Sequence, residues 1–412
     1  MSTPTINTVL ATAFTPAVGN DGSLQYGVKW GGPYGTGVAL TYSFPKDTGW
    51  HIDPYGEAEF DSWYPLNSGE KSAVRAALAE WASAANLTFI EVNDGENLVG
   101  DLRLALTDNA FDEAAHAYLP GNNPEGGDVW FKNGAWHENP GSKIKKGSYD
   151  YLTILHEIGH AIGLEHSFEQ PQKIGRAFDS YAFTVMSYSA TPGSNDNYAS
   201  FYPTTPMYYD LVNIQGMYGR GVHSPGNTTY RYKDGKNFWE TIDDTGGIDS
   251  IVHKGSDKAV IDLNIGHWSD LGRSIDFSSG STKWTVMIGP DTLIENATGG
   301  VGKDTIIGNA AANILAGREG KDKLSGGGGT DGFLFDVKLT PANLDTIRDF
   351  TVGQDIIRLA HEVFGALGVG AVSAAEFAAH FDYAGGLLGY KGKPVVKLNG
   401  APAIDADDLL VV

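Results

Sequence analysis

Apolar residues recur at helical spacing directly after a capping sequence in the first half of the chain. The stretch Asn67–Glu70 (NSGE) has the form of a capping box, in which Asn67 accepts a backbone N–H and Glu70 reaches back. We therefore predict that a helix begins here and buries one of its faces. The apolar positions on that face, at spacings of four, three and four, are Val74, Leu78, Trp81 and Ala85.

Several short segments around this helix have the pattern of strands. In Asp101–Thr107, Leu102, Leu104 and Leu106 alternate onto one face, which we expect to be buried. Further predicted strands are Val38–Phe44, Leu87–Val92, His116–Leu119 and Asp128–Phe131. The first half is therefore predicted to be an α+β domain, a twisted sheet backed by helices.

The pattern changes near residue 223. Helical spacing disappears, and Gly, Asp and Asn separate short apolar stretches such as Asp249–Val252 and Lys283–Ile288. A helix signal returns late, at Ala374–His380. At 412 residues the chain is long enough for two domains, and we expect one at residues 1–222 and an all-β one at 223–412.

A nine-residue period begins at Gly299 and reads GGVGKDTII, GNAAANILA, GREGKDKLS and GGGGTDGFL. This G-G-x-G-x-D-x-U-x pattern is typical of a parallel β-roll whose turns bind calcium. The Asp carboxylate is a hard oxygen ligand, and the glycines let turn carbonyls face the ion. A flexible Gly-rich linker is the alternative, but the apolar residue at one slot disfavours it. The second unit is degenerate, with Asn313 in the Asp position. The predicted calcium-binding residues are Gly299, Gly300, Gly302, Asp304, Gly317, Gly320, Asp322, Gly326, Gly327, Gly329 and Asp331.

Charge and composition narrow the possible ligands. A formal charge of −21, from 29 Lys and Arg against 50 Asp and Glu, argues against a nucleic-acid partner, which needs clustered cations. The same carboxylates suit bound cations, or an acidic surface that only aids solubility. The chain has no cysteine, so disulfides and thiolate zinc sites are excluded.

A zinc motif lies in the stretch YDYLTILHEIGHAIGLEH. His156 and His160 are four residues apart, so a helix presents both on one face, where they can bind a single zinc ion. Gly163 can end that helix in a left-handed conformation and turn the chain back, which brings His166 in as the third ligand. Glu157 lies beside the first ligand, where it can act as general base on a water at the metal.

This motif, followed by Val185–Tyr188 (VMSY), resembles the metzincin metalloproteases and, within them, the serralysin family. Similar stretches are LTYSF at 40–44, HAYLPG at 116–121 and PMYYDLVNIQGMYG at 206–219, so the resemblance spans most of the chain. Ser167 stands where the family usually has Pro, and the loop Phe168–Asp179 is unfamiliar.

The resemblance implies roles for further residues. Met186 would form the hydrophobic floor below the histidines, and Tyr188 would bind the resting metal and then steady the transition state. The segment His116, Ala117, Tyr118 and Leu119 would be the edge strand that pairs with an extended substrate. A calcium-binding segment at the start of the second domain would use Asp244, Gly246 and Asp249, with Gly226 and Thr228 as backbone partners. An ordinary acidic turn is the alternative for that segment.

The chain termini suggest a route of export. Met1–Asn20 has no basic region followed by an apolar core, and no apolar run is long enough to span a membrane. The end, Asp407–Val412, resembles the acidic-then-apolar terminus read by the bacterial type I secretion apparatus. We therefore expect a secreted, extracellular and monomeric zinc endopeptidase that acts on proteins or peptides.

Two other interpretations stay open. A catalytically silent, calcium-binding adhesin or secretion passenger would carry a damaged zinc motif, whereas all three ligands and Glu157 are intact here. A selective processing protease is not distinguished from a broad one. The remaining histidines show no ligand spacing and are expected on the surface: His51, His137, His253, His267, His361 and His380.

Overall fold

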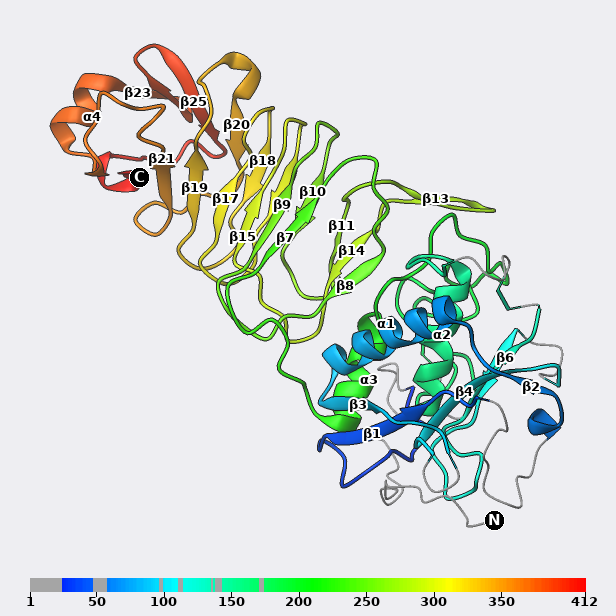
Figure 1. Cartoon of the computed structure of the whole chain (residues 1–412). Helices are drawn as coiled ribbons and strands as arrows, with labels where there is room; N and C mark the ends of the chain where they lie inside the picture. The colour runs from blue at the N-terminus through cyan, green and yellow to red at the C-terminus, as the bar shows by residue number, and fades with distance from the viewer. Residues whose placement is uncertain are drawn as a thin grey trace. The chain divides into compact units, whose positions relative to one another are not determined.

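The computed structural model describes residues 24–46, 58–95, 99–109, 114–134, 136–137, 143–169 and 174–412. The chain forms two compact units. The first unit comprises Met1–His223, Phe238–Asp243 and Ile275–Ser281, and the second comprises Ser224–Asn237, Asp244–Ser274 and Thr282–Val412. Each unit contains its own β-sheets. The strands are coloured by residue number in Figure 1.

A mixed sheet with the strand order β3-β1-β4-β6-β5 forms the centre of the first unit, and β2 also pairs with β4. The strands β3, β1, β4 and β6 run parallel, whereas β5 pairs antiparallel with β6 at the sheet edge. The bounds are β1 Val38–Ser43, β2 Trp63–Tyr64, β3 Leu87–Glu91, β4 Leu102–Thr107, β5 Ala115–Ala117 and β6 Val129–Lys132. Shorter strands of this unit are β8 Glu240–Ile242, β12 Ile275–Phe277 and β13 Gly280–Thr282.

The helices of the first unit are η1 Ala58–Ser62, α1 Ser68–Ala84, α2 Tyr149–Ala161 and α3 Tyr208–Tyr218. The predicted capping box is present: Asn67 Oδ1 accepts from the backbone of Glu70, and Glu70 Oε2 accepts from Asn67 N at 2.7 Å. The predicted face of α1 is buried, and Trp81 on it donates from Nε1 to Leu155 O of α2 at 3.1 Å. This bond attaches α2 to α1 at Leu155, the residue directly before His156.

The strand β4 differs from the prediction of one buried face. All six of its residues are buried, including Arg103 and Thr107 on the face expected to be open. The guanidinium of Arg103 is accommodated because it pairs with Asp94, and the Thr107 hydroxyl donates to Glu59 O. The edge strand begins one residue earlier and ends two residues earlier than predicted, at Ala115–Ala117, so that Tyr118 and Leu119 follow it.

Two larger, mainly parallel sheets make up most of the second unit (Figure 1). One has the order β10-β16-β18-β20-β25-β24-β23, and the other the order β22-β26-β21-β19-β17-β15-β9-β7. The first sheet contains β10 Val260–Asp262, β16 Thr305–Ile307, β18 Lys323–Ser325, β20 Asp345–Ile347, β23 Phe381–Ala384, β24 Leu387–Tyr390 and β25 Lys393–Leu398. The second contains β7 Thr229–Tyr232, β9 Ser250–His253, β15 Asn296–Thr298, β17 Ile314–Ala316, β19 Gly332–Phe335, β21 Ile356–Leu359, β22 Gly370–Ala371 and β26 Leu409–Val411.

Successive nine-residue repeats contribute strands to the two sheets in turn. Ile306 is in register with Leu324 in one sheet, and Leu315 is in register with Phe333 in the other, so paired residues are eighteen apart. All four side chains are fully buried. The apolar slot of the repeat therefore supplies the core of this unit.

The remaining elements of the second unit are β11 Trp268–Ser269, β14 Val286–Ile288, η2 Pro341–Asn343, α4 Ala374–His380 and η3 Ala406–Asp408. The helix α4 has the predicted bounds, because Ser373 and Glu376 form a second capping box. Among the described residues, no helix combines the length and the apolar character that crossing a bilayer requires.

Candidate metal centre

The helix α2 carries the first two histidines of the motif, and a glycine turn brings back the third. Gly163 has φ +108°, and a Cβ there would stand 2.6 Å from Met217 Cε and 2.7 Å from Val28 O. Glycine is therefore required both by the left-handed backbone and by the close packing. After this turn His166 joins His156 and His160 in one cluster that could hold a metal ion.

Each of the three imidazoles is anchored through its Nδ1 atom. His156 Nδ1 lies 2.8 Å from Val185 O, and His160 Nδ1 lies 2.8 Å from Leu164 O. Because a carbonyl oxygen only accepts, each of these Nδ1 atoms carries the proton and each Nε2 presents a lone pair. His166 Nδ1 lies 2.8 Å from Glu169 Oε1 in the same manner. This outer shell of acceptors is the arrangement that orients histidine ligands toward a metal.

The three Nε2 atoms converge at a spacing that fits zinc. His160 Nε2 lies 3.1 Å from His156 Nε2 and 3.0 Å from His166 Nε2. Ligand nitrogens about 2.0–2.1 Å from a tetrahedral zinc stand roughly 3.3 Å apart, close to these separations. Burial, and then the charge of His166, lower the pKa of His156 to about 3, and burial lowers the pKa of His160 well below its usual value. Both imidazoles are therefore neutral at physiological pH, as metal binding requires.

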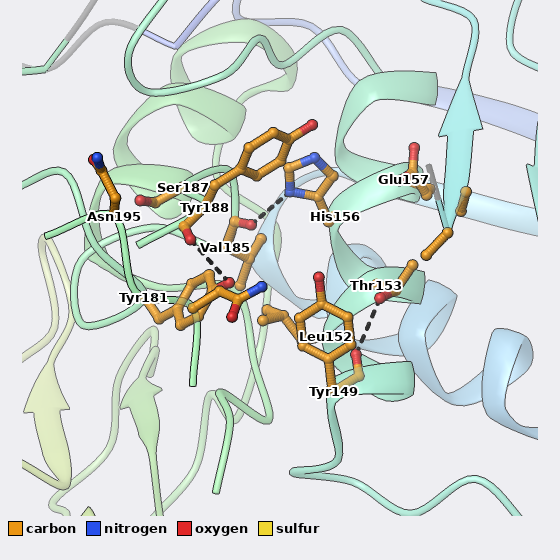
Figure 2. A pocket seen from close by; sticks show the side chains of 13 residues that line it. Tyr149, Leu152, Thr153, His156, Glu157, Tyr181, Val185, Ser187, Tyr188 and Asn195 are labelled. Carbon is orange, nitrogen blue, oxygen red and sulfur yellow. Dashed lines mark hydrogen bonds between the residues drawn. The ribbon is translucent and has the colours of Figure 1, made fainter. Parts of the chain in front are cut away.

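Glu157 and Met186 lie on opposite sides of α2. Glu157 is buried but lines a pocket beside His156 (Figure 2). Met186 is completely buried and packs against Gly159, where a Cβ would stand 2.6 Å from its Sδ. The turn that carries Met186 is held by Asp210 of α3, which accepts from Val185 N and from the Thr184 hydroxyl.

Tyr188 reaches the histidine cluster from the far end of the same turn. Its hydroxyl lies 2.9 Å from His166 Nε2, although the side chain is 47% exposed. The ring contacts those of His156, His166 and Phe168, with centroids 4.7–5.4 Å apart. The phenol oxygen therefore lies as close to His166 Nε2 as the Nε2 atom of His160 does.

The pocket has a volume of about 380 Å³ and lies between α2, β5 and the turn of Met186. Figure 2 shows Tyr149 and Leu152 along one wall and Tyr181 opposite them. The edge strand β5 contributes Ala115 to its lining. The pocket therefore extends from the edge strand to Glu157.

The predicted edge-strand residues His116 and Tyr118 direct their side chains away from this lining. His116 Nε2 and Tyr118 OH each lie 2.8 Å from the buried Glu59 Oε1. Sequence reasoning did not identify Glu59, because it lies 57 residues before His116 and belongs to no motif. The strand therefore offers its backbone, and not these two rings, at the open edge of the sheet.

In the second unit the structure brings the predicted repeat residues together at the turns between strands. Asp304 Oδ2 accepts from Gly300 N at 2.7 Å, and Asp304 Oδ1 accepts from Ala259 N at 2.8 Å. Asp322 Oδ1 accepts from Asp304 N, and Asp331 Oδ1 accepts from Asn313 N. In the degenerate repeat Asn313 makes the equivalent local bond, from Asn309 N to its Oδ1 at 2.8 Å. The remaining predicted residues occupy the same turns: Gly299, Gly302, Gly317, Gly320, Gly326, Gly327 and Gly329.

These buried carboxylates repel one another in the absence of cations. Burial, and then Asp345, raise the pKa of Asp322 to about 8. Burial, with smaller contributions from Asp355 and Asp349, raises the pKa of Asp331 to about 6. Asp322 Oδ2 is buried without a hydrogen-bond partner among the described residues. A divalent cation would neutralise such oxygens.

The predicted segment at the start of this unit is also assembled. Thr228 N donates to Asp249 Oδ1 at 2.6 Å, and a Cβ on Gly247 would stand 2.6 Å from Gly226 C. Asp244 Oδ1 accepts from Gly246 N at 3.0 Å. The Oδ2 atom of Asp249 is buried and has no hydrogen-bond partner in the described chain.

Two histidines expected on the surface are buried. His137 lies between Glu70 and Asp150, with nitrogen-to-oxygen distances of 3.5 and 3.9 Å, and His253 Nε2 lies 3.0 Å from Asp234 Oδ1. Spacing alone missed both because their carboxylate partners are distant in the sequence. The predicted surface position of His51, and part of the loop Phe168–Asp179, lie outside the described residues.

Comparison with known proteins supports the resemblance. Residues 64–179 match the matrixin family model, and residues 221–387 match the model of the serralysin C-terminal domain. Serralysin of Proteus mirabilis is 31% identical over 69% of this chain and 63% of its own length. Serralysin of Photorhabdus laumondii is 30% identical over 67% of this chain and 60% of its own length. The metalloprotease AprA of Pseudomonas entomophila is 30% identical over 78% of this chain and 72% of its own length.

The chain spans about three fifths of the length of these serralysins and almost three quarters of AprA. The two family models cover regions that together contain the histidine motif and the nine-residue repeats. With the convergent imidazoles and the shared sequence, the conclusion follows that this chain belongs to the serralysin family of metalloproteases.

Proposed function

We propose that this chain is a secreted zinc-dependent endopeptidase that hydrolyses peptide bonds of proteins. The observation that carries the proposal is the convergence of three Nε2 lone pairs, each fixed by an acceptor at Nδ1. His156, His160 and His166 would hold the zinc, with Tyr188 as a further ligand at rest. When bound, the zinc polarises the scissile carbonyl and lowers the pKa of a water molecule toward neutrality.

The side chains around the site supply the remaining steps. Glu157 takes a proton from the attacking water and returns it to the departing amine, as general base and then general acid. The phenol of Tyr188 donates to the oxyanion that develops on the substrate carbonyl. The backbone of β5 pairs with an extended substrate, which positions the peptide bond above Glu157.

The substitution Glu157→Ala tests this function. We expect the variant to keep one zinc per chain and to lose nearly all activity on casein. Glu362→Ala is the control, since it removes an exposed carboxylate that belongs to neither the histidine cluster nor its outer shell. An active Glu157→Ala enzyme would contradict the assignment, and a wild-type protein that binds zinc but cleaves nothing would favour the silent adhesin or passenger.

We further propose that residues 1–222 form the catalytic domain and that residues 223–412 form a calcium-stabilised β-roll with a C-terminal secretion signal. The proposal is supported by the parallel pairing of strands eighteen residues apart and by the raised pKa values of Asp322 and Asp331. The calcium ligands would be the turn glycine carbonyls and the repeat carboxylates, together with Asp244 and Asp249. Export by a type I apparatus would deliver the chain to calcium-rich surroundings outside the cell.

A further inference from the structure

One carboxylate oxygen joins the two chain segments that meet at the metal centre. Asp179 Oδ1 accepts from the Ser167 hydroxyl at 2.6 Å and from the Ser187 hydroxyl at 2.7 Å. Ser167 directly follows His166, and Ser187 lies between Met186 and Tyr188. Both serines are buried, at 0% and 1% exposure. The distances are those of O–H donors to an ionised acceptor, the stronger class of hydrogen bond.

The backbone contact between these segments is weaker than the contact through Asp179. Ser167 N donates to Met186 O at 3.3 Å, near the upper limit for such a bond. The Ser187 hydroxyl oxygen also accepts from Ser189 N at 3.0 Å. Ser187 therefore holds the backbone on both sides of Tyr188. The carboxylate therefore makes the shortest hydrogen bonds between the segment of Tyr188 and that of His166. Longer bonds run beside them, from the Ser167 hydroxyl to Met186 O and from the Tyr181 hydroxyl to Tyr188 O.

Tyr188 depends on such backbone control because its side chain is nearly half exposed. Its hydroxyl must nevertheless reach to 2.9 Å from His166 Nε2. A surface phenol on a freely moving turn would lose most of that placement to rotamer and backbone motion. Ser167 is moreover this chain's departure from the Pro that usually follows the third histidine, and Pro has no hydroxyl to offer Asp179.

We propose that Asp179 is a positioning residue that fixes the Tyr188 phenol against His166 by clamping Ser167 to Ser187. The proposal rests on the proposed function, in which Tyr188 is both a resting metal ligand and an oxyanion donor. It predicts that loss of the clamp lowers kcat and weakens the Tyr188–metal bond, while the three histidines still hold the metal.

The test compares Asp179→Ala with Asp179→Asn in the full-length, calcium-saturated enzyme. The Asn side chain keeps an oxygen that can accept from both serines but has no charge, so this variant should stay much closer to wild type than Asp179→Ala does. For Asp179→Ala we expect kcat on a fluorogenic peptide to fall at least about tenfold, and at most by the roughly 10²–10³ that loss of the whole oxyanion donor costs, with KM nearly unchanged. Zinc content should stay at one per chain.

A second readout does not depend on activity. In protein loaded with Cu²⁺ in place of zinc, a phenolate ligand gives a charge-transfer absorption band, which Tyr188→Phe should abolish. Asp179→Ala should weaken or shift this band, and Asp179→Asn should retain it. A merely structural role, in which Asp179 only closes its loop, would lower the melting temperature and leave the band of the folded protein intact.

Single serine variants keep the test decisive if Asp179→Ala does not fold. Ser167→Ala and Ser187→Ala each remove one arm of the clamp and should each weaken the band. Ser189→Ala is the matched control, since its hydroxyl donates to Ser194 O and not to Asp179. A wild-type band and kcat in the folded Asp179→Ala variant, or in both serine variants, would overturn the proposal.

The outcomes separate this proposal from the proposed function. An inactive wild-type enzyme contradicts the function itself, and a fully active Tyr188→Phe contradicts the role of Tyr188. An impaired Tyr188→Phe beside an unimpaired Asp179→Ala contradicts only the clamp.

Discussion

Gly159 lies between the two helical histidines, and adding one methyl group there should disturb the floor of the metal centre. A Cβ would stand 2.6 Å from Met186 Sδ and 3.3 Å from a carbon of Trp81, whereas favourable contacts lie at roughly 3.5–4.0 Å. Met186 and Trp81 are both fully buried, so neither can swing into solvent. The substitution Gly159→Ala must therefore displace the Met186 side chain within the closed core.

The expected free energy of unfolding combines two opposing effects. Replacing Gly by Ala inside a helix stabilises it by about 1 kcal/mol. Overpacking a closed core costs about 1–3 kcal/mol. The net change should therefore lie between about zero and a loss of about 2 kcal/mol. In a Met186→Ala background the added methyl group has room, so the same substitution should then stabilise the protein. The coupling between the two sites should reach about 1–3 kcal/mol.

Urea unfolding of zinc- and calcium-loaded protein, followed by circular dichroism at a helix-sensitive wavelength, would measure this cycle. Most helical residues of the described chain lie in the first unit, so the signal reports on that unit. Gly216→Ala in α3 is the matched control, since its Cβ would meet only the end of the Gln25 side chain, at 3.2 Å. If Gly159→Ala stabilises both backgrounds equally and leaves zinc affinity unchanged, the close packing of Met186 on Gly159 is refuted.

Two further predictions concern pH and the cap of α1. The pKa values of Asp322, Asp331 and Asp345 are raised to about 8, 6 and 6, above those of the unfolded chain. In their protonated form these three carboxyl groups contribute to the free energy of unfolding. That contribution is complete below about pH 4 and is lost as pH rises through 6 to 8, where the folded protein loses the protons. Without calcium, but with zinc kept saturated, the melting temperature of the second unit should fall over that range, and added calcium should reverse the fall. If the calcium-free melting curve were the same at every pH between 5 and 8, the repulsion among these carboxylates would be contradicted. Asn67→Ala should cost about 1 kcal/mol by removing the cap of α1. Zinc content should not change, and a stability equal to wild type in thermal unfolding would show that the cap contributes nothing.

Local patterns predicted much of this structure because their physics is local. The capping residues Asn67 and Glu70 start α1 where expected, and the i, i+4 histidines lie on one face of α2. The repeat specified which residues would be buried, since Ile306, Leu315 and Leu324 all occupy the apolar slot. In each case the partners lie within one turn of helix or two periods of the repeat.

What the sequence did not reveal depends on partners far apart in the chain. Glu59 binds His116 and Tyr118, and Asp94 balances Arg103 in a strand that was expected to be half open. No periodicity connects such residues, because only the folded sheet brings them together. The contact of Asp179 with Ser167 and Ser187 was similarly hidden, although Ser167 and the loop Phe168–Asp179 were visible departures from the family pattern.

The alternation of the repeats between two sheets limits how this gene can change length. A deletion of nine residues would send every later strand to the opposite sheet, where Leu324 would take a place now held by Leu315. A deletion of eighteen would remove one full coil and return all later strands to their original sheet. Viable length variants should therefore differ by even numbers of repeats, so that parity constrains the evolution of this domain.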